Sequence, residues 1–167
     1  SIYIESSNIA DASVTLVSVT YELDDRRGVE GGDLLEAEML ARKSIHIREK
    51  ISGSYHRGIE PSLSTLERIL RLKGNHDDEV KALLERLLII AIKSEGAISK
   101  NVIIANNNLG VFHSNNSHDM PSGDARTEVI SLAESYFKEA VRISSIIYGP
   151  THHQTLEYEP VLSTIRQ

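Results

Sequence analysis

The sequence contains no cysteine and no tryptophan, and only 5% of its residues are aromatic. Without cysteine, a disulfide framework and a cysteine-ligated zinc site are both excluded. Because aromatic side chains are so scarce, the core must be built from Leu, Ile, Val and Ala, which suits close helix–helix packing better than a sheet sandwich. The composition therefore favours an all-α fold.

Long hydrophobic runs are missing as well. The longest run, Leu87 to Ile92, is far too short to span a bilayer, and no basic segment leads into an apolar one as in a secretory signal. The net charge is −6 and no local basic patch is visible. We therefore expect a cytoplasmic protein whose partners are neither membranes nor nucleic acids.

The usual motifs of catalysis and cofactor binding are also absent. The sequence has no Gly-rich phosphate loop with Lys-Ser/Thr, no Gly-x-Ser-x-Gly elbow and no His-Glu-x-x-His. His152 and His153 are adjacent, and adjacent helical side chains point about 100° apart, so they rarely chelate one metal. We predict no enzyme activity, no cofactor and no metal site.

The chain does contain an internal repeat. Apolar residues of the segment Gly32 to Ile47 follow the spacing of an amphipathic helix. The same pattern returns at offsets of 43 and 96, and the matched positions include Ala37 with Val80 and Ala133, Ala41 with Leu84 and Phe137, Gly53 with Gly96 and Gly149, and His56 with His152. An irregular helical bundle with accidental similarities is the alternative.

These offsets predict a single helical-repeat domain over residues 1–167. Its parts are an incomplete leading unit (1–31), repeat one (32–73), repeat two (74–123) with a loop insertion (114–123), and repeat three (124–167). The insertion is rich in Asn, Ser, Pro and Gly, which is typical of a loop. In the leading unit, Ala12, Leu16 and Val19 fit a helix, although Ser13 to Tyr21 alone predicts a strand.

Further expectations follow for single positions. The glycines after the long helices should adopt left-handed backbone conformations that end them. The side chains expected between neighbouring helices are Leu84, Leu88, Phe137 and Ala140. By its repeat position, His152 is interpreted as a structural anchor of the inter-helix turn, whereas His113 and His118 should face solvent.

Three segments carry a family resemblance. Gly32 to Ile47 is similar to G-x-x-x-E-A-E-x-L-x-x-R-A-L-x-I, Gly149 to Thr155 to G-P-x-H-P-x-T/V, and Asn107 to Gly110 to N-N-L-A. Together the chain resembles tetratricopeptide repeats, in the longer-unit variety of kinesin light chains, over roughly Gly32 to Thr155. The middle copy departs from the pattern, because Val80 replaces a small alanine and no histidine follows Gly96.

The resemblance implies a solenoid of about three helical hairpins with incomplete ends, in which the first helix of each hairpin lines a concave face. Those helices should run from about Pro61 to Lys73 and from about Lys100 to Ser114. The polar residues expected to contact a partner are Thr65, Arg68, Arg71, Asn107 and Asn108. Asn108 matches the family position whose amide contacts peptide backbone. Arginine offers bidentate donors to carboxylates, so an acidic or C-terminal peptide would suit this face.

Two function classes remain open at this point. The first is an adaptor or scaffold module that binds a peptide or partner domain. The second is a structural subunit packed permanently inside a larger complex. A hydrolase-type enzyme on a helical scaffold is a third and remoter class. A polar groove of Asn and Arg would favour the adaptor, whereas exposed apolar area would favour the structural subunit.

Overall fold

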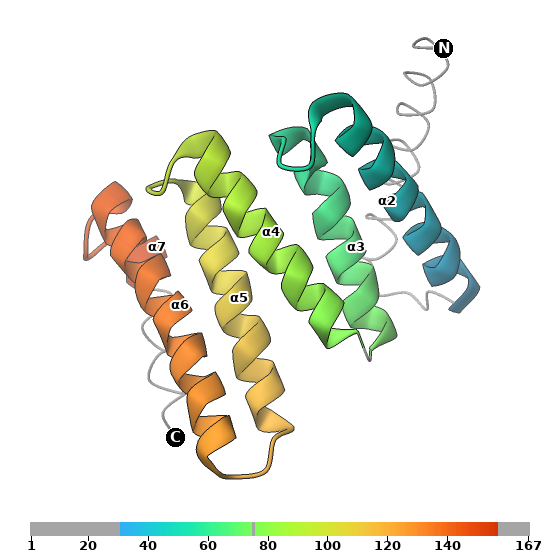
Figure 1. Cartoon of the computed structure of the whole chain (residues 1–167). Helices are drawn as coiled ribbons and strands as arrows, with labels where there is room; N and C mark the ends of the chain where they lie inside the picture. Colours follow the sequence, from blue (N-terminus) through green and yellow to red (C-terminus); the bar gives the residue numbers. More distant parts are fainter. Residues whose placement is uncertain (1–30, 75, 157–167) are drawn as a thin grey trace. The chain divides into compact units, whose positions relative to one another are not determined.

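A computed structural model describes residues 31–74 and 76–156, and every regular element in this part of the chain is helical, as the all-α prediction requires. The elements are α2 (Gly31–Ser52), the 3-10 helix η1 (Arg57–Ile59), α3 (Glu60–Lys73), α4 (Asp77–Glu95), α5 (Lys100–His118), α6 (Asp124–Tyr148) and α7 (His153–Leu156) (Figure 1). The helix expected through Ala12, Leu16 and Val19 lies outside the described residues.

Contacts group the chain into two compact units that divide between Ile90 and Ala91, within α4. The prediction of a single domain over residues 1–167 stays a prediction. The first unit ends at Ile90 and includes α2, η1, α3 and most of α4. The second begins at Ala91 and includes α5, α6 and α7.

In the first unit, α2 and α3 lie side by side as an antiparallel hairpin joined through η1 (Figure 1). Small side chains are buried on α2, including Ala37 and Ala41, and larger aliphatic side chains are buried on α3, including Leu63 and Leu70. The hydroxyls of Ser44 and Ser62 hydrogen bond to each other at 2.9 Å within this interface. Small residues on α2 let the helices approach closely, and the paired hydroxyls satisfy each other away from water.

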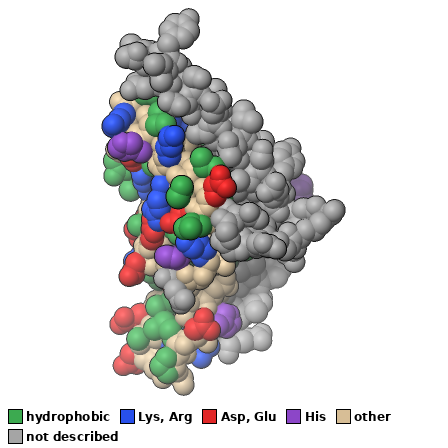
Figure 2. Space-filling view, turned by 90° about the vertical axis from the view of Figure 1, so that its right-hand side faces the viewer, with side chains coloured by type: hydrophobic (Ala, Val, Ile, Leu, Met, Phe, Trp, Pro, Cys, Tyr) green, Lys and Arg blue, Asp and Glu red, His purple; other side chains and the backbone are tan. Residues whose placement is uncertain are grey.

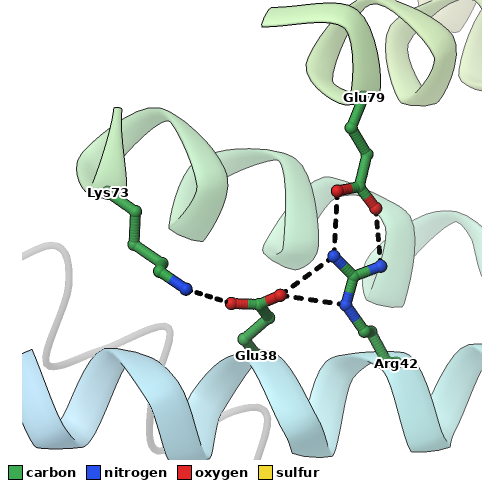
Figure 3. Close-up of polar contacts among 4 residues, drawn as sticks. All are labelled: Glu38, Arg42, Lys73 and Glu79. Atoms are coloured by element: carbon green, nitrogen blue, oxygen red, sulfur yellow. Dashed lines mark hydrogen bonds and ion pairs between the residues drawn. The ribbon is translucent and has the colours of Figure 1, made fainter. Parts of the chain in front are cut away.

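Four charged side chains connect the elements of the first unit at one end of the hairpin (Figure 3). Arg42 of α2 donates to both carboxylate oxygens of Glu79 on α4, at 2.5 and 2.9 Å. Its Nε donates to Glu38 at 3.0 Å, and Lys73 at the end of α3 donates to the other oxygen of Glu38 at 2.5 Å. This cluster, the α2 charge network, therefore links α2 to the end of α3 and to the start of α4.

In the second unit, α5 and α6 form the main packed pair (Figure 1). Phe137 of α6 is buried with its ring against Gly110 of α5. A Cβ atom added at Gly110 would lie 2.8 Å from Phe137 Cζ, closer than van der Waals packing permits. The absence of a side chain at Gly110 therefore makes room for the ring of Phe137.

The turn after α2 recurs after α6 with the same hydrogen bonds. His56 N donates to Gly53 O, and His152 N donates to Gly149 O, both at 3.3 Å. Within each turn the histidine Nδ1 accepts from a backbone N–H two residues later, at 3.1 Å for His56 and 3.3 Å for His152. The interpretation of His152 as an anchor of the inter-helix turn is therefore confirmed.

The turn between α4 and α5, in the middle copy of the sequence repeat, is capped by a different side chain. Ser99 stands at the position that corresponds to His56, at the offset of 43, and its Oγ accepts from Val102 N as the N-cap of α5. The preceding glycines agree across all three copies, with φ of 84° at Gly53, 86° at Gly96 and 99° at Gly149. The positive φ expected of a helix stop is therefore confirmed at all three glycines, although ψ of 155° places Gly149 outside the αL region. Glycine adopts a positive φ without strain from a Cβ.

The core predictions are confirmed at three of four positions. Leu84, Phe137 and Ala140 are buried, whereas Leu88 is only partly buried. Both repeat positions that begin at Ala37 and Ala41 are buried in all three copies, and their members are Ala37, Val80 and Ala133, and Ala41, Leu84 and Phe137.

The expected loop over 114–123 is wrong in its first half. Ser114 to His118 continue α5, and only Asp119 to Gly123 connect it to α6. Ser117 is buried and its hydroxyl donates to Ser114 O at 2.7 Å, so this polar stretch is satisfied within the helix. Packing against α6 overrides the weak helix propensity of Asn and Ser.

Candidate interaction surface

The exposed side of α3 in the first unit holds the predicted arginines. Ser64, Arg68 and Arg71 share one helix face through spacings of four and three residues, and the remaining sides of α3 are mostly buried. Together with Pro61 they form what we name the α3 stripe. Thr65 lies beside it but is buried, and its hydroxyl donates to Pro61 O at 2.9 Å. Thr65 is therefore not part of the exposed face of α3.

Glu67 changes the chemistry of this stripe. It is buried at the border of the α3 stripe, and Arg71, one turn later, forms an ion pair with it. Burial raises the pKa of Glu67, and the nearby positive charges of Arg71 and Arg68 oppose that rise. Some of the N–H donors of Arg71 are therefore already engaged by the carboxylate of Glu67. The ion pair between Glu67 and Arg71 could be predicted from their spacing of four residues. The burial of Glu67 could not be predicted from the sequence.

The exposed side of α5 in the second unit holds the predicted asparagines. Ile104, Asn107, Asn108, Val111 and Asn115 follow the spacing of a single helix face, and each is exposed or partly exposed. We name this set the α5 stripe. The opposite side of α5 is buried, and includes Val102, Asn106 and Leu109.

The asparagines of α5 divide into two groups by their hydrogen bonds. Asn106 is buried and donates to Val102 O at 2.8 Å, and Asn101 donates to Glu95 at 2.7 Å. By contrast, among the described residues no hydrogen bond satisfies the side-chain amide of Asn107 or Asn108. An amide of this kind retains both its donors and its acceptor for solvent or for a partner.

The predicted site residues therefore fall in two places, each within its own unit. Arg68 and Arg71 share the α3 stripe, and Asn107 and Asn108 share the α5 stripe. The apolar members Ile104 and Val111 were not predicted as site residues. Helical spacing alone, counted from Asn108, would have identified them.

Two of the histidines, His113 and His152, make structural contacts. His113 was expected to face solvent, but this is wrong, because α5 continues past it and buries its ring in parallel stacking on Tyr136 of α6, with 5.6 Å between the ring centroids. His118 is exposed as predicted. His152 stacks on Tyr148 at 5.3 Å in addition to capping its turn.

No metal-binding cluster is found in the part of the chain that the structure describes. Within residues 31–74 and 76–156, no group of three His, Asp or Glu side chains is placed to hold a metal ion. Across the same residues, no helix has the length and apolar character that crossing a bilayer requires. On the described part of the face shown in Figure 2, hydrophobic, acidic and basic side chains all reach the surface.

Comparison with known proteins adds no assignment. No protein-family model matches the chain, and no curated protein matches it either.

Proposed function

We propose that this chain is a tetratricopeptide-like helical-repeat module that binds a peptide or a partner domain through the exposed faces of its first helices, α3 and α5. The observation that carries the proposal is the pair of amides at Asn107 and Asn108, which no hydrogen bond satisfies among the described residues. Each amide can donate to a carbonyl and accept from an N–H of an extended peptide.

The repeated turns support the helical-repeat part of this proposal. His56 and His152 make equivalent hydrogen bonds at an offset of 96, and the positions of Ala37 and Ala41 are buried in every copy. A hairpin of this size cannot bury its apolar face alone, so equivalent hairpins stabilise one another by stacking. The proposed role is that of a cytoplasmic adaptor or scaffold without enzymatic activity.

On α3, the arginines would favour an acidic segment of the partner. Arg71 keeps an exposed side chain, and one carboxylate such as Glu67 engages at most two of the five N–H donors of a guanidinium. Replacing Arg71 with Glu would leave the buried Glu67 without its ion pair, so such a variant would confuse binding with folding. A bulky substitution at the exposed Ser64 blocks the same face without touching that pair.

The test is recovery of the native partner from an extract of the source by the immobilised chain. Variants Ser64→Trp and Asn107→Ala/Asn108→Ala should each lose most of the partner, whereas Lys43→Glu, on the exposed side of α2, should retain it. Melting temperatures measured on the same preparations control for folding. Loss of the partner by Lys43→Glu alone would contradict the proposal and place the interface on α2.

One observation favours a second function, that of a structural subunit packed permanently in a complex. Leu35 and Met39 of α2 are 56% and 63% exposed and lie one turn apart. Exposed aliphatic side chains on one helix face are typical of a permanent interface. The Lys43→Glu variant, on the next turn of the same face, distinguishes the two functions.

A further inference from the structure

The middle of α5 carries no charged side chain. Residues 101–117 contain no Asp, Glu, Lys or Arg, although these types make up 25% of the whole chain. Lys100 and His118 stand at the two ends of the helix. The absence is surprising on a helix with an exposed face, because solvent-facing positions normally hold charged residues.

The neighbouring helix shows what an ordinary exposed face looks like in this protein. On α6, Lys138 pairs with Glu134 at 2.8 Å and Arg142 pairs with Glu139 at 2.7 Å. The α5 stripe offers only aliphatic and amide groups in their place, and Ile104 is 44% exposed. The two faces therefore differ in chemistry within one packed pair of helices.

An uncharged surface of this kind discriminates among partners. A charged side chain placed on it would lose part of its hydration and would meet no opposite charge from residues 101–117 of α5 in return. A peptide backbone, by contrast, presents N–H and C=O groups that the amides of Asn107 and Asn108 can complement. Aliphatic side chains of such a peptide would find contact with Ile104 and Val111.

We propose that the α5 stripe binds an extended segment of a partner protein that lacks charged residues and contains aliphatic ones. This inference rests on the proposed function and assigns the chemistry of one of its two faces. Because the stripe carries no charge and presents the adjacent amides of Asn107 and Asn108, it should bind an uncharged segment more tightly than an acidic peptide. The α5 stripe thus differs from the α3 stripe, whose arginines favour carboxylates.

The experiment is selection of ten-residue peptides from a random displayed library on the whole chain. Peptides bound through the α5 stripe are those whose affinity falls at least about tenfold, or about 1.4 kcal/mol, on Asn107→Ala/Asn108→Ala. Asn116→Ala is the matched control, because Asn116 lies on α5 outside the stripe. Circular dichroism melting verifies that the variants fold.

The stripe-dependent peptides should be depleted of Asp, Glu, Lys and Arg relative to the library and enriched in Val, Ile and Leu. Their affinity should change less than about twofold between low and high salt, since no ion pair is screened. A second variant, Ile104→Lys, should shift the selection toward acidic peptides, and it tests the inference even if the alanine variant fails to fold.

Stripe-dependent peptides rich in acidic or basic residues would overturn the inference. If Ser64→Trp abolishes the binding of some peptides, but neither Asn107→Ala/Asn108→Ala nor Ile104→Lys abolishes the binding of any, the inference fails while the proposed function stands. If no peptide depends on either face, both fail.

Discussion

At the scale of single residues, the contact between Gly110 and Phe137 sets how closely α5 and α6 approach. The ring of Phe137 occupies the space that a side chain at position 110 would need, with only 2.8 Å from a hypothetical Cβ to Phe137 Cζ. Backbone preference and packing therefore oppose each other at this position. Alanine is intrinsically better than glycine inside a helix by roughly 1 kcal/mol, but here it would collide with a buried ring.

We predict that Gly110→Ala lowers the free energy of unfolding by about 1–3 kcal/mol, because overpacking outweighs the helix propensity gained. Urea denaturation followed by circular dichroism measures the change. Adding Phe137→Leu to the variant should recover part of the loss by removing the ring. A higher stability for Gly110→Ala alone would mean that the two helices do not pack as described.

A second residue-scale prediction concerns the repeated turn. His56→Ala and His152→Ala should each destabilise the chain by about 1 kcal/mol, the usual cost of losing a side-chain cap. Asparagine at either position should retain most of the stability, since its side-chain oxygen can accept the same backbone N–H. The exposed His118 provides the control, and its replacement by alanine should leave the melting temperature unchanged. Equal effects of all three alanine variants would contradict the capping role.

At the scale of helices, the α2 charge network fixes three elements of the first unit. The hydrogen bond from Lys73 lowers the pKa of Glu38, and the hydrogen bonds from Arg42 lower that of Glu79, below the ordinary value of 4.5. Since both folded-state pKa values are depressed, the network stabilises the fold fully above that value. Its contribution is lost as the pH falls through the lowered values.

Glu38→Gln should therefore cost about 1 kcal/mol at pH 7 and progressively less as acid removes the same interactions from the native protein. The buried Glu67 acts in the opposite direction, because burial raises its pKa and protonation removes an unfavourable buried charge. Unfolding in urea at pH 7 and at pH 3 measures both contributions. The control is Glu85→Gln, at an exposed pair with 3.8 Å to Lys81, which should change the stability at pH 7 by much less than Glu38→Gln does. A loss that stays constant with pH would exclude an electrostatic origin.

The helices themselves could be foreseen from the sequence, because the signals that define them are local. Pro61 lies in the first turn of α3, and acids open α4 at Asp77 to Glu79 while Lys93 closes it. Glycines ended the long helices as expected. The end of α5 could not be foreseen, since Ser114 to His118 remain helical through contacts with another helix, which local composition does not encode.

The candidate surface could be foreseen only in part, for the same reason. Asn107 and Asn108 lie on an exposed helix face, but Thr65 is buried and Arg71 is engaged by Glu67. Sequence periodicity gives the direction in which a side chain points from the axis of its own helix. Whether that direction leads to solvent depends on where the neighbouring helix packs. The absence of charged residues from 101–117 can be read from the sequence. Whether it leaves an uncharged surface depends on which of these positions are exposed, which only the structure shows.

At the scale of the whole molecule, we propose that α3 in the first unit and α5 in the second unit each present a face that partners contact. Their exposed stripes differ in chemistry, with arginines on α3 and uncharged side chains on α5. Binding should therefore depend on salt only through α3. Raising the ionic strength should weaken the binding of a partner segment on the α3 stripe by a modest factor and should barely change the binding of one on the α5 stripe.

Site-specific photocrosslinking tests this claim most directly. A photoreactive amino acid is placed singly at Ser64 and at Ile104, on the two stripes, and at Lys43 and Lys138, on the exposed sides of α2 and α6. After incubation with an extract of the source and irradiation, we predict partner adducts from positions 64 and 104 and none from positions 43 and 138. Adducts from positions 43 and 138, with none from 64 and 104, would contradict it.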